Sequence, residues 1–341
     1  MVGAATLVVM AEEQPHDTLF KETFSSPANA ASHLQAVLPR TIVERVDWSS
    51  LTSVSTQFIV KELDTVQADL LLRAKLDGRD AFIHLLFEGQ SGEDGMMAFR
   101  MLRYLVCIWA DYLKQYPKAK RLPAVIPCVL YHGPRPWKAA TNVADLVDLE
   151  ESTRAALGPL LPSLAFQLDD LRALSSEQIE QRMTSAVVRL VLLALRDFKG
   201  GSAAGFVRLA GLVREVSETE SGPEALATVL CYLFKVADPD PEQVRGFLDE
   251  HVGEKGVEAY VTAAEKLTKE AAEKAAEQGR AEGRAEGRAE GLARALLIQL
   301  DMKFSPVSEA MVAKVQTASS AQLTSWITRV VAAETLDDVF A

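Results

Sequence analysis

The stretch that decides the fold runs from residue 69 to residue 90 and reads DLLLRAKLDGRDAFIHLLFEGQ. Its two halves, residues 69–76 and 81–88, have the length and apolar content of β-strands. Between them lies Asp77-Gly78, a dipeptide that favours a tight hairpin turn. The sequence therefore predicts two antiparallel strands in this stretch.

Polar residues stand at the ends of both predicted strands. Side chains alternate between the two faces of a strand, so Glu88 and Gln90 share a face. A two-residue loop would set Asp69 opposite Leu86 and diagonal to Glu88, whereas a four-residue loop would set Asp69 directly opposite Glu88. Both loops place Asp69 on the face of Glu88 and Gln90. The Cβ atoms would then be about 4.5–5.5 Å apart if opposite, or about 7–8 Å if diagonal.

Either separation suits one divalent cation held between two carboxylates. Facing carboxylates destabilise a sheet, and a bound Mg²⁺ or Mn²⁺ would remove that penalty. Such an ion lowers the pKa of a bound water and polarises a phosphate, while Gln90 would orient the water through its amide. Glu88 also ends a strongly apolar strand, where a carboxylate needs a partner. The alternative is that Asp69, Glu88 and Gln90 are ordinary solvated strand ends.

The flanking segments add helices and another strand. Residues 16–38 are predicted to form two helices separated by a Ser/Pro break, residues 96–114 a helix, and residues 124–131 an apolar strand. This order is typical of an α/β or α+β fold. Residues 141–260 are predicted to be mostly helical, with residues 164–168 as the candidate for an extra strand.

Basic residues gather between residues 96 and 138, where only Asp111 opposes them in a chain with a net charge of −11. A groove beside the carboxylates would bind DNA phosphates through these residues, with aromatic rings adding contacts. The candidates for DNA contact are Arg100, Arg103, Tyr104, Tyr131 and Lys138. The alternative for each basic residue is a solvated helix face. The other basic residues are Lys114, Lys118, Lys120, Arg121 and Arg135.

Composition narrows the class of protein. The chain is 48% hydrophobic and 24% charged, which fits a soluble globular protein. Its three cysteines have no paired spacing, so we expect neither structural zinc nor a disulfide framework, and a cytoplasmic location. The apolar start lacks the basic residues of a signal peptide and is too short to span a membrane. We expect a disordered tail over residues 1–13, or a natural start at Met10; a signal peptide is the remaining alternative.

Near the C-terminus the sequence GRAE occurs three times, beginning at Gly279, Gly283 and Gly287 and followed by Gly291. Each glycine within a helix costs about 1 kcal/mol relative to alanine. One interpretation is a helix whose small residues pack against a partner helix, with Arg and Glu pairs outside. The other is a flexible charged linker. The helix is favoured because Ala, Glu and Arg form helices well.

Several short segments together resemble a known family, the recombination-promoting nucleases, also described as YhgA-like putative transposases. The family belongs to the PD-(D/E)XK nuclease superfamily, and the resemblance covers roughly residues 14–240. The segments occur in this order: His16-Asp17-Thr18-Leu19-Phe20-Lys21, Leu38-Pro39, Asp69-Leu70-Leu71, Phe87-Glu88-Gly89-Gln90-Ser91, Arg100-x-x-Arg103-Tyr104, Leu122-Pro123 to Tyr131-His132-Gly133, and Pro136-Trp137.

The resemblance implies a restriction-endonuclease-like core, a mixed sheet flanked by helices, and a Mg²⁺-dependent DNA endonuclease that promotes recombination. It implies that Asp69, Glu88 and the carbonyl of Gly89 bind the metal, and that Gln90 replaces the superfamily lysine. The first helix often adds an acid, for which Asp17 and Glu22 are both candidates. Two departures stand out: Gly89 occupies a position usually held by histidine, and Ala68, not proline, precedes Asp69.

We therefore expect a nuclease core over residues 14–140, a helical extension packed on it over 141–260, and the repeat as helix or linker over 261–295. A small helical domain over 296–341 resembles the DUF4351 domain of unknown function, and we expect homo-oligomers through these C-terminal helices. Two alternatives to an active endonuclease are a catalytically weak DNA-binding or transposition accessory protein and an oligomeric interaction scaffold. No membrane partner is expected.

Overall fold

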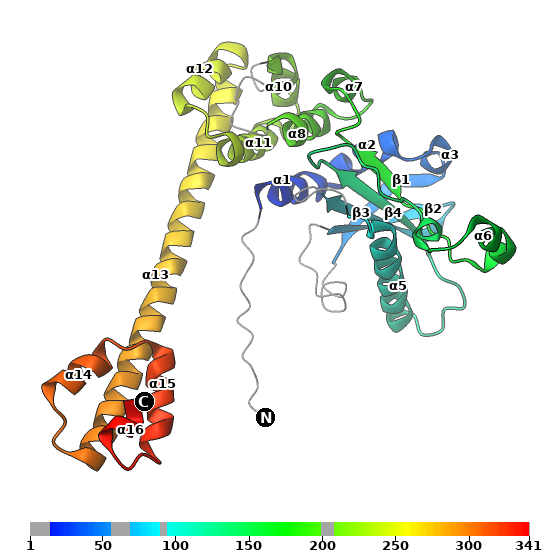
Figure 1. The fold of residues 1–341 in the computed structure, drawn as a ribbon. Coiled ribbons are helices and arrows are strands. Elements are labelled where there is room, and N and C mark those ends of the chain that lie inside the picture. The colour runs from blue at the N-terminus through cyan, green and yellow to red at the C-terminus, as the bar shows by residue number, and fades with distance from the viewer. Residues whose placement is uncertain (1–13, 56–68, 89–93, 199–207, 341) are drawn as a thin grey trace. The chain divides into compact units, whose positions relative to one another are not determined.

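A computed structural model describes residues 14–55, 69–88, 94–198 and 208–340 (Figure 1). The expected tail over residues 1–13, with Met10, lies outside the described residues, as do Gly89 and Gln90. The chain divides into two compact units, Met1–Ala264 and Glu265–Ala341. Cys107, Cys128 and Cys231 are not joined to one another by disulfides.

Within the described residues, five strands form one sheet in the order β1-β2-β3-β4-β5. The β1–β2 and β2–β3 pairs are antiparallel, and the β3–β4 and β4–β5 pairs are parallel. This mixed sheet with flanking helices, followed by a long helical region, confirms the predicted fold class. The strands are β1 Val46–Val54, β2 Asp69–Leu76, β3 Arg79–Glu88, β4 Ala124–Tyr131 and β5 Gln167–Asp170.

The helices that accompany the sheet agree with the predicted segments at residues 16–38 and 96–114, and the region after residue 140 is mostly helical, as predicted. The α-helices are α1 Pro15–Phe24, α2 Pro27–Val37, α3 Arg40–Val43, α5 Met97–Gln115, α6 Glu151–Leu157, α7 Ser176–Glu180, α8 Ala186–Asp197, α10 Ala210–Ser217, α11 Gly222–Ala237 and α12 Pro241–His251. Two 3₁₀ helices are η1 Val143–Leu146 and η2 Gly158–Leu160.

Two features of the sheet differ from the prediction. Strand β1 was not predicted, because its sequence VDWSSLTSV is rich in serine and its register shifts between Asp47 and Thr52. The extra strand predicted at residues 164–168 lies instead at Gln167–Asp170, while Ala165 makes only an isolated bridge with Asn142. Short polar strands carry little periodic signal.

The turn between β2 and β3 has the two-residue form. Leu76 pairs with Arg79, and both turn residues have positive φ, 48° at Asp77 and 75° at Gly78. Positive φ at both central positions is the type I′ pattern, whose twist matches that of paired strands. Of the two loop lengths compatible with the sequence, the shorter one is therefore present.

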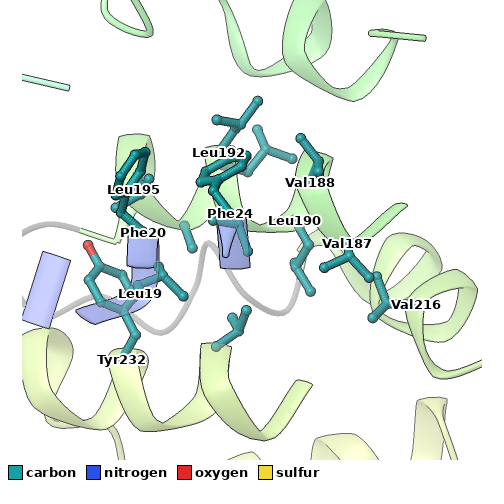
Figure 2. Packing of buried hydrophobic residues seen from close by; sticks show 14 of the residues in the cluster. Leu19, Phe20, Phe24, Val187, Val188, Leu190, Leu192, Leu195, Val216 and Tyr232 are labelled. Atoms are coloured by element: carbon teal, nitrogen blue, oxygen red, sulfur yellow. The ribbon is translucent and has the colours of Figure 1, made fainter. Parts of the chain in front are cut away.

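Both faces of the sheet are buried. Leu70, Leu72 and Ala74 face a hydrophobic cluster formed with α1, α2, α8 and α11, and Figure 2 shows Phe20 and Phe24 of α1 within it. Leu71 and Leu86 face a second cluster formed with α5. The first cluster contains residues from both sides of residue 140, so the sheet and the later helices share one interior. Burial on both faces explains why β3 is almost continuously apolar.

The second unit is helical where the structure describes it. Helix α13, Glu254–Phe304, contains the whole GRAE repeat, which confirms the helix and excludes the linker. The helices after it are α14 Glu309–Gln316, α15 Ser320–Val330 and α16 Leu336–Phe340. They pack on the end of α13 through Leu296, Leu300, Val315, Leu323 and Trp326. No helix among the described residues is long and apolar enough to cross a membrane.

The type I′ turn makes a specific prediction at Gly78. Substitution Gly78→Ala places a Cβ on a residue with φ of +75°, and we expect it to lower the free energy of unfolding by about 1–2 kcal/mol. Urea unfolding followed by circular dichroism measures this loss. Gly95→Ala is the matched control, since Gly95 has no positive φ and a Cβ there would meet nothing within 4 Å. Equal losses in the two variants would contradict this account of the turn.

A buried polar cluster joins α2 to β5. The His33 side chain is 1% exposed, and its Nε2 lies 3.7 Å from Oδ2 of Asp169. Arg182 donates hydrogen bonds to both oxygens of that carboxylate. Burial, only partly opposed by Asp169, lowers the pKa of His33 to about 4. At neutral pH, His33 is therefore uncharged, and the ion pair of this cluster is the one between Arg182 and Asp169.

The lowered pKa of His33 predicts a pH dependence of stability. The unfolded chain protonates His33 near pH 6.5 and the folded chain near pH 4, so acidification between these values favours the unfolded state. We expect His33 to contribute about 2 kcal/mol to the loss of stability between pH 7 and pH 5. Urea unfolding at both pH values should show a smaller loss for His33→Gln than for the wild type. An equal pH dependence in the two proteins would refute the assignment.

Candidate functional site

The strand register places two acidic residues at one end of the sheet. Strands β3, β4 and β5 end there, at Glu88, Tyr131 and Asp170, and antiparallel β2 begins there at Asp69; we call this the carboxyl end of the sheet. Asp69 pairs with Leu86, and Glu88 pairs with Tyr131. By strand alternation, the positions of Asp69 and Glu88 belong to the face that α5 covers. The two residues are thus diagonal neighbours on one face.

The donor chemistry of these two positions fits a hard cation. Carboxylate oxygens are the ligands of Mg²⁺ and Mn²⁺, and Mg²⁺ often takes only one or two of them and completes its shell with water and phosphate. No group of three or more His, Cys, Asp or Glu side chains in the described part of the chain is arranged to hold a metal ion. The predicted ligand Gly89 and the predicted catalytic Gln90 lie outside the described residues.

The first turn of α1 also lies at the carboxyl end of the sheet. His132, which follows the last residue of β4, stacks on Phe87 with ring centroids 4.5 Å apart. Two residues of α1 contact this pair of rings. The ring centroids of His16 and His132 are 4.9 Å apart, and the ring of Phe20 stacks on Phe87 with centroids 4.7 Å apart. Phe87 directly precedes Glu88 but belongs to the opposite face of β3, so this aromatic cluster fixes α1 at the carboxyl end of the sheet on the face opposite to that of Glu88.

A tyrosine from the later helices completes that cluster. The Tyr232 hydroxyl of α11 is hydrogen-bonded to Nδ1 of His16 at 2.8 Å. Figure 2 shows Tyr232 beside Leu19 and Phe20, and burial raises the pKa of its hydroxyl, which keeps it uncharged. Sequence reasoning missed this residue because 216 positions separate it from His16. No local pattern marks such a contact.

The structure distinguishes the two candidate acids of the first helix. Asp17 is half-buried and lies in the first turn of α1, next to His16 at the carboxyl end of the sheet. Glu22 is exposed, and its Oε2 accepts a hydrogen bond of 2.9 Å from the Thr228 hydroxyl of α11. Asp17 is therefore nearer than Glu22 to the carboxyl end of the sheet, on the helix that covers the face opposite to that of Asp69 and Glu88.

Two of the predicted DNA-binding residues are core residues. Tyr104 and Tyr131 are 0% and 1% exposed. The Tyr104 ring meets His84 edge-on, and the Tyr131 ring meets Trp137 in the same way. Neither ring is presented to DNA, so the expectation for these two residues was wrong: both lie on inward-facing positions of their elements. A Cβ at Gly133 would lie 2.1 Å from the Tyr131 hydroxyl, which explains the glycine there.

The three predicted cationic residues lie nearer the surface. Arg103 and Lys138 are exposed. Arg100 is mostly covered, and its Nη1 donates a hydrogen bond of 2.8 Å to Oδ2 of Asp94. Lys138 lies in the loop after β4. A hydrogen bond of 2.7 Å from the backbone N–H of Trp137 to Oδ2 of Asp170 holds this loop against β5.

The basic segment does not form the single groove that the sequence predicted. Helix α5 runs back along the sheet: its Tyr104 contacts His84, and further along Tyr112 contacts Phe82. β4 then begins opposite Ala81, about 23 Å from Glu88 at 3.3 Å per residue. The residues near that far end are Lys114, Lys118, Lys120 and Arg121, whereas Arg100, Arg103, Arg135 and Lys138 remain toward the carboxyl end.

Comparison with known proteins assigns the family. Recombination-promoting nuclease RpnD of Escherichia coli O157:H7 is 31% identical over 186 residues, 54% of this chain and 68% of the relative. Recombination-promoting nuclease RpnA of Escherichia coli K12 is 30% identical over 186 residues, 54% of this chain and 61% of the relative. The inactive recombination-promoting nuclease-like protein RpnE of the same strain is 29% identical over 184 residues, 54% of this chain and 59% of the relative.

The match thus spans about three fifths of the length of the two K12 relatives. No solved structure matches the chain. The model of the family described as putative transposase, YhgA-like, matches residues 14–223, which contain the whole sheet and α1. The chain belongs to the YhgA-like putative transposase family.

Proposed function

We propose that this chain is a Mg²⁺-dependent DNA endonuclease that promotes recombination. The observation that supports this most is the β2–β3 register, because it brings Asp69 and Glu88 to one face at the carboxyl end of the sheet. Carboxylates at that spacing suit one hard cation. The names of RpnD and RpnA support the same reaction class.

In this proposal Asp69 and Glu88 hold the metal, with the Gly89 carbonyl as a further ligand. A bound Mg²⁺ supplies the Lewis acid that polarises the scissile phosphate and acidifies a water. Gln90 orients the attacking water through its amide, and Asp17 is the additional acid from the first helix. The cluster of His16, His132 and Tyr232 holds the first turn of α1, and hence Asp17, in place.

DNA approaches an acidic chain only through local positive charge. We assign the phosphate contacts to the cationic residues toward the carboxyl end of the sheet, chiefly Arg103 and Lys138, which are exposed. Arg100 lies one turn before Arg103 on α5 and is paired with Asp94, so it contributes to the local field more than to direct contact. Lys118 and Lys120, at the far end, are not assigned to the site.

A second candidate function is a catalytically weak DNA-binding or accessory protein. The relative named inactive is 29% identical to this chain, close to the 31% and 30% of two relatives named nucleases, so identity alone does not separate the two functions. Gly89, where the family pattern has histidine, favours this second candidate. A direct assay of cutting decides between them.

The test of catalysis is nicking of supercoiled plasmid by the full-length chain. We expect nicking with Mg²⁺ and none with EDTA. Loss of a residue that only supports a metal ligand reduces activity by up to roughly 100-fold. Asp69→Ala removes a proposed ligand itself, so it should reduce the nicking rate by more than that. Asp47→Asn, an exposed acid on β1, is the control and should nick like the wild type. If Asp69→Ala nicks as fast as the wild type, the proposed site is wrong; if the wild type binds DNA without cutting, the accessory function is supported.

The test of the DNA surface compares the two ends of the sheet. Arg103→Ala should weaken binding to a DNA duplex and reduce the slope of log affinity against log salt by about 1, because one phosphate contact is lost. Lys118→Ala, an exposed cation at the far end, is the matched control and should leave both quantities unchanged. Fluorescence anisotropy over a salt series measures both. A larger effect from Lys118→Ala would place the DNA at the other end of the sheet.

A further inference from the structure

The GRAE repeat gives α13 four separate rows of side chains. A helix advances about 100° per residue, so residues four apart are neighbours and each row rotates by about 40° per repeat. Over residues 279–291 one row holds the glycines, the next the arginines, the third the alanines and the fourth the glutamates. Seen around the helix, the glycine row lies between the arginine row and the glutamate row.

The charges of the repeat destabilise α13 when it is considered as a single helix. Each arginine of the row Arg280, Arg284 and Arg288 has another arginine four residues away, and the glutamates Glu282, Glu286 and Glu290 repeat in the same way. Like charges at this spacing destabilise a helix, and Arg and Glu are here two or six residues apart, on different faces. No ion pair joins two residues of 279–291, all of which the structure describes. The predicted pairing of Arg with Glu along this helix was therefore wrong.

The contacts that these side chains do make involve no opposite charge. Arg284 Nε donates a hydrogen bond of 3.2 Å to the backbone carbonyl of Arg280. Glu282 Oε1 accepts one of 3.0 Å from Gln278. Both charged rows are thus exposed, and neither forms an ion pair with the opposite charges one turn beyond its ends, Glu277 before Arg280 and Arg294 after Glu290, which the structure also describes.

The glycines of the repeat also have no explanation inside this chain. None of Gly279, Gly283, Gly287 and Gly291 has a positive φ, and a Cβ at each would meet nothing within 4 Å. Glycine is among the least favourable residues for a helix interior, and its usual advantage is close approach of another backbone. The alanine row differs at one end only, because Ala289 and Ala293 pack into the cluster formed with α14, α15 and α16, whereas Ala281 and Ala285 are exposed. The glycine row is thus the small-residue row that is exposed along its whole length.

We propose that the glycine row is the contact line of a parallel pair formed with a second copy of this chain. The arginine and glutamate rows lie on the two sides of the glycine row. In a parallel pair, the row on one side of the contact line faces the row on the other side of the partner's contact line, as the e and g positions of coiled coils do. The arginine row of each copy would then face the glutamate row of its partner. An antiparallel pair would set arginine against arginine and glutamate against glutamate, so the charges select the parallel orientation.

The charge pattern also identifies the occupant as a second copy. Because the rows rotate about the axis, only a partner with the same four-residue period keeps three arginines opposite three glutamates. A second copy of α13 supplies that period, both charges and a matching glycine row. The i±4 rows of two such helices pack at a crossing angle of about −50°, which confines the contact to a few turns and fits the length of the repeat.

Site-directed cross-linking of the full-length chain tests the orientation. In a parallel pair each residue of the contact line meets its own copy, so Gly283→Cys and Gly287→Cys should each form a covalent dimer under mild oxidation. Ala281→Cys, on the opposite row, should not, and the wild type with Cys107, Cys128 and Cys231 gives the background. Cross-linking of Gly283→Cys only to a size-tagged Gly287→Cys chain would show an antiparallel pair and overturn the proposal.

Charge reversal tests the complementarity. Changing Arg280, Arg284 and Arg288 to Glu, or Glu282, Glu286 and Glu290 to Arg, should weaken self-association by about 10-fold or more at low salt, as measured by sedimentation equilibrium. An equimolar mixture of the two variants should associate again. A wild type that is monomeric, or variants that dimerise as strongly as the wild type, would refute the proposal; circular dichroism confirms that α13 remains helical in each variant.

Discussion

The two-residue turn at Asp77 and Gly78 sets which residues of β2 lie opposite which residues of β3. Because side chains alternate faces with a period of two, a shift of one residue would exchange the two faces of β2. Leu70 and Leu72 would leave the interior formed with α1 and α8, and Leu71 would leave the one formed with α5. The same register holds Asp69 and Glu88 on one face at the carboxyl end of the sheet. Core packing and candidate site thus depend on one constraint.

Strongly patterned segments were predictable from sequence, and contacts between distant segments were not. The Asp77-Gly78 turn, the apolar β3 and β4 and the helix α5 each carry a local signal, so their places were predicted correctly. β1 lacked such a signal because its serines hide the alternation. Tyr104 was mistaken for a surface residue, since an amphipathic helix near a candidate site does not reveal which aromatic residues point inward. The division of the basic segment followed from the direction of α5, which only the three-dimensional structure provides.

The helices after the sheet belong to the architecture of the candidate site. The family model ends at residue 223, yet Tyr232 of α11 hydrogen-bonds His16 at the start of α1. His33 and Asp169 likewise connect α2 to β5 in the buried interior, and Arg182 balances the charge. The second unit is of another kind: its repeat helix has exposed rows of charge and glycine with no role inside the chain. Packing explains the first unit, whereas for the repeat we propose pairing with a second copy.

The most direct test of the proposed site is metal binding, measured without reference to cutting. Electron paramagnetic resonance measures the concentration of free Mn²⁺ in a titration of the full-length protein in physiological salt, and the bound Mn²⁺ follows by difference. We predict one site that Mg²⁺ displaces and that Asp69→Asn or Glu88→Gln weakens by about 10-fold or more, as expected when a carboxylate ligand loses its charge. Asp47→Asn should bind like the wild type. Equal Mn²⁺ affinity in the wild type, Asp69→Asn and Glu88→Gln would contradict the assignment of these two residues as the metal site.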